Sequence, residues 1–452
     1  MKTIVRLAPS PTGYLHVGNI RLALINWLFA KKNNGEFILR FDDTDTSRSQ
    51  TKYVEAIKDD LLFLKIEWDK EAKQSDQIEK YDSITQDLKS RGLLYACYET
   101  PEELDFKRKI LRSQNKPPIY DRSALKLTES QKLTFQNEGR KPHWRFKLKN
   151  SEICWSDLVR GDVKYNTSNQ SDPVVVRADG TYLYLLPSVV DDLNHNISHV
   201  IRGEDHVTNS AVQLEMMEAI EPGSSIEFAH VPLLQGGSGE ALSKRTGSLS
   251  IMDLRNSSIE ALSICSLLAR LGSSDSVEAY SSMQEMILDF DISTFSRATP
   301  KFNLKELSNL NSKVLQKLTF TDISARLETA GIDKSDLDVK GQMFWEAIKS
   351  NINNFSDAVN WWNICFNPLS TIPLAQDLLT HAEASLPMEP WSEKTWAEWT
   401  ENLKQLSGVK GKKLFLPLRK ALTGLDSGPE LKDLLPLIGR DNTLKRISGQ
   451  IT

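Results

Sequence analysis

The fold is decided by residues 3–41, which read TIVRLAPSPTGYLHVGNIRLALINWLFAKKNNGEFILRF. Residues 3–8 are mostly apolar or β-branched and predict a strand, and the prolines that follow require a loop. From Val17 onward, apolar residues recur at the spacing of one helical face, and Gly35 is a natural stop. Residues 36–41 predict a second strand. This order is a βαβ unit, so we expect a parallel sheet with a right-handed crossover.

A second α/β pattern follows later in the chain. Residues 198–202 predict a strand, residues 209–220 a helix and residues 228–234 another strand. The segment between the two halves is roughly a hundred residues long, which is the size of a domain. After Asn303 helical patterns dominate to the end. We therefore predict the α/β class, with a Rossmann-like parallel-sheet domain, an inserted α/β domain and an all-helical C-terminal region.

Composition is that of a folded protein of the cytoplasm. The chain has 452 residues, of which 40% are hydrophobic and 26% charged. No apolar run approaches the ~18 residues that a membrane span needs, and the N-terminus lacks a signal-peptide pattern. The four cysteines form no C-x-x-C pair, so free thiols in a reducing compartment are expected.

The net charge of −4 argues weakly against a nucleic-acid partner, but the basic residues are clustered. A solvated surface is the simplest interpretation of any one cluster. An acidic enzyme that handles tRNA would nevertheless need local basic patches, because phosphate contacts dominate affinity. The first cluster is Lys107, Arg108, Lys109, Arg112 and Lys116, the second is Arg140, Lys141, Arg145, Lys147 and Lys149, and the third is Lys404, Lys410, Lys412, Lys413, Arg419 and Lys420.

Two short motifs indicate phosphate chemistry. In the first loop, His16 lies at the start of the predicted helix, where it can donate to a phosphate, and Gly18 lets a flat base approach the backbone. The second motif, LSKRTG at residues 242–247, follows the glycine-rich residues 236–239. A lysine on such a loop suits a phosphate whose charge builds up during the reaction. Each motif alone is weak, since turns and short basic loops are common.

Together the two motifs resemble the class I aminoacyl-tRNA synthetases. The PSPTG sequence at residues 9–13, with RFDDTD at residues 40–45, narrows the resemblance to the glutamyl/glutaminyl branch. The segments VVDD at 189–192, VIRGEDH at 200–206 and LFLPLR at 414–419 are also similar to the glutamyl-tRNA synthetase family. The resemblance therefore runs along nearly the whole chain.

The resemblance implies roles for individual residues. It makes His16 and Lys244 the catalytic residues, which stabilise the phosphates of ATP. The residues expected to bind ATP are Ser10, His16, Gly18, Asn19, Ser243, Lys244 and Arg245. The residues expected to bind glutamate are Arg6, Ser10, Asp42, Tyr184 and Arg202, with the two arginines on the side-chain carboxylate and Asp42 facing the amino group.

Several positions depart from the family pattern. Asn19 replaces a second histidine, and Ala241 replaces the first lysine of the second motif, although Lys244 remains. Ser188 stands where some relatives have asparagine.

Some relatives carry zinc in the insertion. Here Cys97 and Tyr120 match two ligand positions, but Glu99 and Ala124 occupy the other two. One thiolate without a nearby cysteine partner makes a poor tetrahedral site, so we predict no structural zinc.

The resemblance implies activation of glutamate with ATP and Mg²⁺ and its transfer to tRNA(Glu), with tRNA(Gln) as a further candidate. A monomer without membrane attachment is expected. The implied organisation places the catalytic domain in two halves around an insertion for the tRNA acceptor end, followed by a stem-contact region and an anticodon-binding region. The first catalytic half spans residues 1–66, the insertion 67–185 and the second catalytic half 186–250. The stem-contact region spans residues 251–303 and the anticodon-binding region 304–452.

Three alternatives remain. A glutaminyl-tRNA synthetase is disfavoured by Arg202, because a cation favours a carboxylate over an amide. A tRNA-modifying paralogue is disfavoured by the long helical part after Asn303. The substitutions at Asn19 and Ala241 keep open a catalytically silent tRNA-binding protein.

Overall fold

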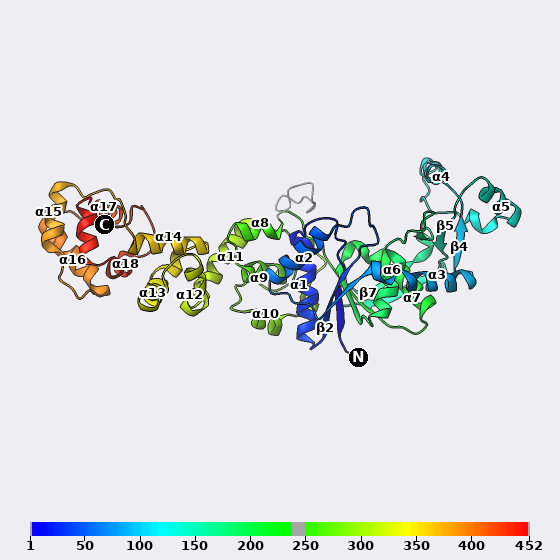
Figure 1. Cartoon of the computed structure of the whole chain (residues 1–452), viewed down its shortest axis with the longest axis horizontal. Helices are drawn as coiled ribbons and strands as arrows, with labels where there is room; N and C mark the ends of the chain where they lie inside the picture. Colours follow the sequence, from blue (N-terminus) through cyan, green and yellow to red (C-terminus); the bar gives the residue numbers. More distant parts are fainter. Residues whose placement is uncertain (1, 237–249, 451–452) are drawn as a thin grey trace. The chain divides into compact units, whose positions relative to one another are not determined.

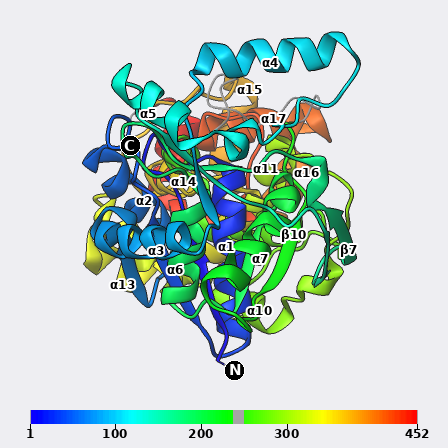
Figure 2. The same cartoon turned by 90° about the vertical axis from the view of Figure 1, so that its right-hand side faces the viewer.

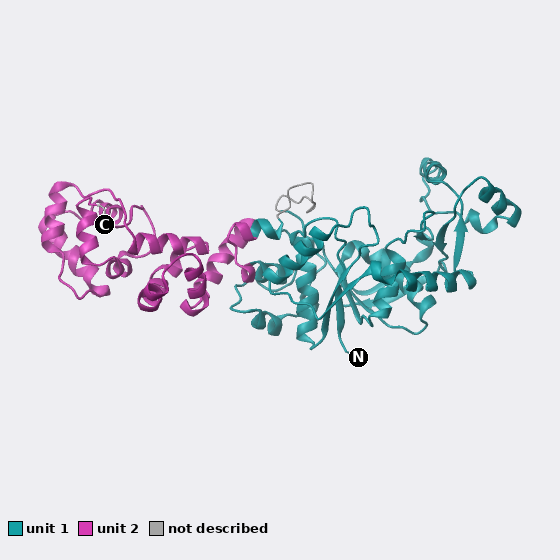
Figure 3. Cartoon of the chain, viewed as in Figure 1, with its two compact units in different colours: residues 1–254, 264–303 teal, residues 255–263, 304–452 magenta. Residues whose placement is uncertain are grey.

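The computed structural model describes residues 2–236 and 250–450. The chain divides into two compact units, shown in teal and magenta in Figure 3. The first unit comprises residues 1–254 and 264–303, and the second comprises residues 255–263 and 304–452.

The predicted βαβ unit is confirmed. Strand β1 (Ile4–Leu7), helix α1 (Val17–Lys32) and strand β2 (Glu36–Phe41) follow one another, and β1 pairs with β2 in parallel. Gly35 ends the helix with a hydrogen bond from its N–H to the Ala30 carbonyl (2.8 Å). A Cβ on Gly35 would lie 2.4 Å from the Thr3 carbonyl oxygen, so only glycine lets the chain turn so close to β1.

The second half of the α/β pattern is confirmed with small shifts in its bounds. The observed elements are strand β9 (His199–Gly203), helix α7 (Val207–Ile220) and strand β10 (Glu227–Val231). Strand β9 pairs with β10 in parallel. Strand β9 also lies beside β1, where the Ser198 N–H donates to the Ile4 carbonyl (2.9 Å). The carboxyl ends of β1, β2, β9 and β10 therefore meet at one edge (Figure 1).

Two further elements flank this sheet. Helix α2 (Thr51–Phe63) leads to strand β3 (Lys70–Lys73), which pairs in parallel with β2. Helix α6 (Leu185–Asn194) leads back into β9 and packs against both α7 and α3 (Ile78–Ser90), as Figure 2 also shows.

The segment between the two halves contributes to two sheets. Strands β4 (Leu94–Cys97), β5 (His143–Phe146) and β8 (Val174–Val176) form a three-stranded antiparallel sheet beside α4 (Pro101–Ser113) and α5 (Glu129–Asn137). Strands β6 (Glu152–Asp157) and β7 (Gly161–Asn166) instead form an antiparallel hairpin whose first strand meets β10, with Asp157 opposite Phe228. Part of the inserted sequence therefore extends the sheet of the first unit.

The C-terminal part is helical, as predicted. Its core includes the buried tryptophans Trp345 and Trp399. No helix among the described residues is long and apolar enough to cross a membrane. The remaining helices are α8 (Ile251–Asn256), α9 (Ala261–Arg270), α10 (Met283–Asp289), α11 (Leu304–Lys317), α12 (Phe320–Thr329), α13 (Lys334–Ile348), α14 (Phe355–Phe366), α15 (Gln376–Ser385), α16 (Glu393–Ser407), α17 (Lys412–Thr423), α18 (Leu431–Ile438) and α19 (Arg440–Ile447).

Candidate active site

A cavity of about 550 Å³ opens at the carboxyl ends of the parallel strands. Most of the site residues that were predicted from the sequence line this cavity. Ser10 is exposed and is not among the residues that line it, and Ser243, Lys244 and Arg245 lie outside the described residues. The predicted site residues that line the cavity are Arg6, His16, Gly18, Asn19, Asp42, Tyr184 and Arg202.

His16 caps the N-terminus of α1. Its Nδ1 accepts from the Gly18 N–H (3.1 Å) and from the Asn19 N–H (3.4 Å), and the Asn19 side chain accepts from the His16 N–H (3.3 Å). A Cβ on Gly18 would lie 2.9 Å from the imidazole, so glycine makes room for this cap. Because Nδ1 is an acceptor, the proton of the neutral ring is on Nε2. His16 thus carries its ring N–H on Nε2, beside the positive end of a helix dipole.

Described residues on each side of positions 237–249 lie at or next to this cavity. Gln235 lines the cavity and pairs with Lys301 in a parallel bridge. Ser250 forms an antiparallel bridge with His16, which also lines the cavity.

A buried ion network occupies one wall of the cavity. The Asp192 carboxylate accepts from Arg6 Nε (3.1 Å) and Nη2 (3.4 Å) and from Arg40 Nη1 (2.6 Å). Arg40 also donates from Nε to Asp42 (2.8 Å) and lies 3.7 Å from the Asp191 carboxylate. Arg40 and Asp192 belong to the RFDDTD and VVDD segments, but no role was predicted for either residue from the sequence.

This network shifts the pKa values of its acids in different directions. Burial opposes ionisation of Asp192, but the Arg6 and Arg40 guanidiniums bring its pKa below the usual value. Burial raises the pKa of Asp42 despite its contact with Arg40, and burial raises the pKa of Asp191 to about 6. The two guanidiniums therefore act mainly to hold Asp192 ionised.

Arg202 also lines the cavity but has different partners. Its Nη1 donates to the Tyr184 hydroxyl (3.1 Å), its Nη2 to Ser210 Oγ (2.5 Å), and its Nε faces His230 Nε2 (3.4 Å). Only 7% of the residue is exposed, and burial lowers its pKa to about 10. Within the described part of the chain, no carboxylate oxygen lies within 4.0 Å of this guanidinium. Arg202 is thus a buried cation that faces the cavity without a counter-ion.

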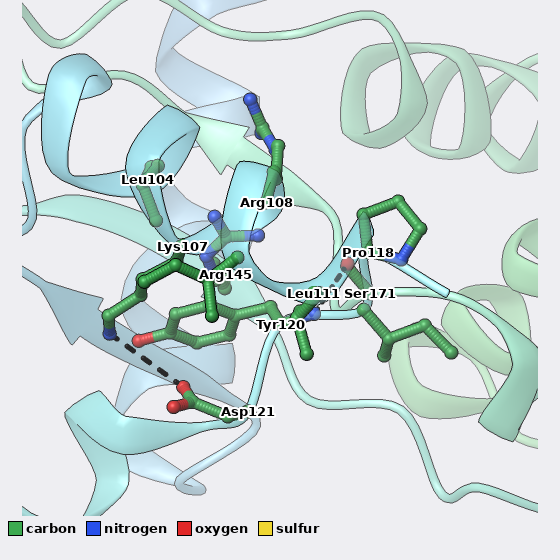
Figure 4. A pocket seen from close by; sticks show the side chains of 11 residues that line it. Leu104, Lys107, Arg108, Leu111, Pro118, Tyr120, Asp121, Arg145 and Ser171 are labelled. Atoms are coloured by element: carbon green, nitrogen blue, oxygen red, sulfur yellow. Dashed lines mark hydrogen bonds and ion pairs between the residues drawn. The ribbon is translucent and has the colours of Figure 1, made fainter. Parts of the chain in front are cut away.

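A second cavity, of about 260 Å³, lies in the inserted segment beside α4 (Figure 4). Lys107 and Arg108 of the first basic cluster and Arg145 of the second cluster all line it. The Arg145 guanidinium lies over the Tyr120 ring, 4.2 Å from its centroid. Folding therefore brings two basic clusters that are separate in sequence to one surface depression with apolar and aromatic walls.

Three potential metal ligands meet next to this cavity. Cys97 and His143 face each other across β4 and β5, and atoms of Cys97, Glu99 and His143 lie within 4.8 Å of one another. His143 was not predicted from the sequence as a potential ligand. The Glu99 carboxylate already accepts from Lys107 Nζ (3.2 Å) and from the Tyr120 hydroxyl (2.8 Å). Burial raises the pKa of the Cys97 thiol to about 11, which opposes thiolate formation.

The ion network generates a stability prediction. Asp192→Asn would leave two buried guanidiniums short of an anion, which costs about 3–5 kcal/mol. We expect the melting temperature of the first unit to fall by roughly 5–15 °C at pH 7. The native pKa of Asp192 lies below its unfolded value of about 3.9, so its contribution is present above that pH and is lost as the pH falls through the native pKa. The mutant and wild type should therefore converge in acid.

Thermal unfolding of both proteins at pH 7 and at low pH measures this effect. Asp43→Asn is the matched control, because Asp43 lies in the same region but accepts from Ser75 instead of from cations. Equal destabilisation by the two substitutions would contradict the role assigned to the Asp192 network.

Comparison with known proteins identifies the family. Residues 2–309 match the model of tRNA synthetases class I (E and Q), catalytic domain, and residues 332–451 match that of the anticodon binding domain. The chain is 49% identical to a glutamate–tRNA ligase of Azospirillum brasilense over 100% of both chains. It is 46% identical to glutamate–tRNA ligase 1 of Maricaulis maris over 99% of both.

A solved structure gives the same answer. The glutamate tRNA ligase of Elizabethkingia meningosepticum, crystallised in complex with its amino acid, superposes with a TM-score of 0.84 at 27% identity. The alignment covers 99% of this chain and 98% of that one. On this evidence the chain belongs to the class I tRNA synthetases of the E and Q branch.

Proposed function

We propose that this protein is a glutamate–tRNA ligase, which activates glutamate with ATP and transfers it to tRNA(Glu). The observation that carries the proposal is Arg202, a buried cation without a carboxylate partner among the described residues, in a cavity that also contains His16 at a helix N-terminus. An acidic side chain would supply the missing counter-ion. The full-length similarity to glutamate–tRNA ligases supports the same substrate.

In the first step, an oxygen of the glutamate α-carboxylate attacks the α-phosphorus of ATP, and pyrophosphate leaves. We assign the phosphates of ATP to His16 and Lys244, and further ATP binding to Ser10, Gly18, Asn19, Ser243 and Arg245. His16 Nε2–H would donate to a phosphate oxygen, and Mg²⁺ would offset the charge of the triphosphate. In the second step, a ribose hydroxyl of the tRNA 3′ end attacks the acyl carbon, and AMP leaves.

We assign the glutamate side chain to Arg202, Tyr184 and Arg6. Arg6 uses Nε and Nη2 for Asp192, so Nη1 is the nitrogen that would reach the substrate. Asp42 would face the substrate ammonium, and a positive charge beside it would favour its ionised form against the effect of burial. The cavity thus offers both cations and a carboxylate, as an amino acid with an acidic side chain requires.

For the tRNA, we assign the acceptor end to the inserted segment and the anticodon to the helical C-terminal part. The cavity in Figure 4 supports the first assignment, because phosphate binding needs cations and a base can stack on an aromatic or apolar wall. The match of residues 332–451 to an anticodon binding domain supports the second. We propose a monomer in the cytoplasm, where the four unpaired cysteines stay reduced.

Aminoacylation of purified tRNA(Glu) and tRNA(Gln) with labelled glutamate tests the function. We expect ATP-dependent charging of tRNA(Glu), and charging of tRNA(Gln) decides whether the enzyme also accepts that tRNA. Labelled glutamine serves as the control for a glutaminyl-tRNA synthetase. Absence of charging with either amino acid would instead favour the catalytically silent paralogue.

Substitution of Arg202 tests the substrate assignment. Arg202→Gln removes the charge and adds an oxygen that can accept from an amide. We expect kcat/KM for glutamate to fall at least about 100-fold, because a charge-assisted pair of ~2–5 kcal/mol is lost, and discrimination against glutamine to narrow. Steady-state aminoacylation with each amino acid measures both. Unchanged glutamate kinetics would show that Arg202 does not bind the substrate.

We further propose that the insertion contains no structural zinc. Cys97, Glu99 and His143 offer three donors, but the fourth family position is Ala124, and Lys107 already supplies positive charge to Glu99. Elemental analysis of the purified protein should find well below one zinc per chain. One zinc that resists chelation and disappears in His143→Ala would prove this wrong and would define a Cys–Glu–His site.

A further inference from the structure

Three buried residues form a hydrogen-bonded chain that ends on Arg202. The Asp157 carboxylate lies 2.5 Å from His230 Nδ1, and His230 Nε2 lies 2.7 Å from Ser210 Oγ. Ser210 Oγ in turn accepts from Arg202 Nη2 (2.5 Å). Asp157 is 3% exposed, and His230 and Ser210 are fully buried. None of these three residues was singled out by the sequence.

The backbone fixes the Asp157 carboxylate. Its Oδ1 accepts from the N–H groups of Val159 (3.1 Å), Arg160 (3.0 Å) and His230 (3.1 Å). Burial opposes ionisation, but these bonds and the imidazole bring the pKa of Asp157 below its usual value. An ionised carboxylate only accepts, so Nδ1 of His230 must carry a proton. Burial also lowers the pKa of His230, which favours the neutral ring.

This proton assignment fixes the remaining hydrogens. With its proton on Nδ1, the neutral imidazole can only accept at Nε2. Ser210 therefore donates to Nε2 (2.7 Å) and not to the more distant His206 carbonyl (3.2 Å), and it accepts from Arg202 Nη2, while Arg202 Nε–H also faces Nε2 at 3.4 Å. In the opposite tautomer, the N–H of His230 Nε2 would face the N–H of Arg202 Nε, and two donors would meet without an acceptor.

The chain leaves a defined part of the guanidinium for a ligand. Arginine has five N–H donors, and Nε, one N–H of Nη2 and one of Nη1 are directed at His230, Ser210 and Tyr184. One N–H remains on each terminal nitrogen, and these are the donors that a carboxylate can accept from. A carboxylate in place of His230 would also orient Arg202, but it would neutralise the charge and compete with the substrate.

We propose that Asp157 and His230 are positioning residues for amino-acid recognition: Asp157 fixes the tautomer of a neutral imidazole, which with Ser210 orients Arg202 without neutralising it. This inference rests on the proposed function, because it takes the Arg202 ligand to be the glutamate side-chain carboxylate. Asp157 comes from β6 of the inserted sequence and His230 from β10, so the inserted sequence would set the geometry of the amino-acid pocket.

Two substitutions in the full chain test the tautomer. Asp157→Asn puts an amide in place of the carboxylate, and an amide N–H directed at Nδ1 would move the ring proton to Nε2. His230→Leu removes the acceptor altogether. For both variants we expect the KM for glutamate to rise about 10- to 100-fold, because a hydrogen bond to a charged group is lost, while the KM values for ATP and tRNA(Glu) stay within about twofold.

A conservative substitution of His230 tests whether this residue orients Arg202 or only fills space in the core. His230→Gln can place an amide oxygen near the position of Nε2, so it should retain part of the glutamate affinity that His230→Leu loses. The matched control is His199→Leu. His199 lies at the other end of β9 and also contacts a serine through Nδ1 (Ser198, 2.7 Å), but it has no contact with Arg202. This control should leave the KM for glutamate unchanged.

The outcomes are distinct. If the wild type does not charge tRNA(Glu) with glutamate, the proposed function fails and this inference fails with it. If the wild type is active but Asp157→Asn and His230→Leu leave the KM for glutamate unchanged, or raise the KM values for glutamate and ATP alike, the positioning role alone is overturned. Thermal unfolding shows whether each variant folds, and if His230→Leu does not, Asp157→Asn and His230→Gln decide the question. Nitrogen NMR of the wild-type imidazole should show the proton on Nδ1, and a proton on Nε2 would also overturn the inference.

Discussion

The arrangement of the cavity depends on one carboxylate, that of Asp192, between the guanidiniums of Arg6 and Arg40. Arg6 comes from β1, Arg40 from β2 and Asp192 from α6, so this contact joins the two halves of the α/β pattern across the inserted sequence. Two buried cations at adjacent strand ends would repel each other without it. The Asp192 carboxylate therefore allows two guanidiniums to lie close together at the carboxyl ends of parallel strands, where α/β proteins bind their ligands.

Arg6, Arg40 and Arg202 show two ways to hold a buried cation. Arg6 and Arg40 contact carboxylates, and their charge is largely neutralised inside the protein. Arg202 contacts a phenol, a serine hydroxyl and an imidazole, all of them neutral partners that leave the full charge in place. The second arrangement favours an external anion more strongly. The chemistry of the supporting residues thus sets how much positive charge each guanidinium retains for a ligand.

Much of the fold could be predicted, because its signals are local. The periodicity of residues 17–32 and the stop at Gly35 gave the first βαβ unit, and motif residues such as His16 and Arg202 proved to line one cavity. Asp157 and His230 were missed because they are 73 positions apart and meet only through the pairing of β6 with β10. His143 was missed for the same reason, since antiparallel pairing alone sets it opposite Cys97. Single-sequence patterns do not specify such pairings between distant strands.

The hairpin β6–β7 has a consequence for modular engineering of this protein. Because β6 hydrogen-bonds to β10, the hairpin cannot be excised with the rest of the inserted sequence without exposing an edge of the first unit's sheet. A chimera that exchanges the antiparallel β4–β5–β8 sheet with that of a relative should therefore keep residues 150–167 from the parent of β10. For recombination between related genes, this means that the β6–β7 hairpin and β10 must come from the same parent. Breakpoints that separate the hairpin from β10 would place two unmatched strands side by side in the sheet.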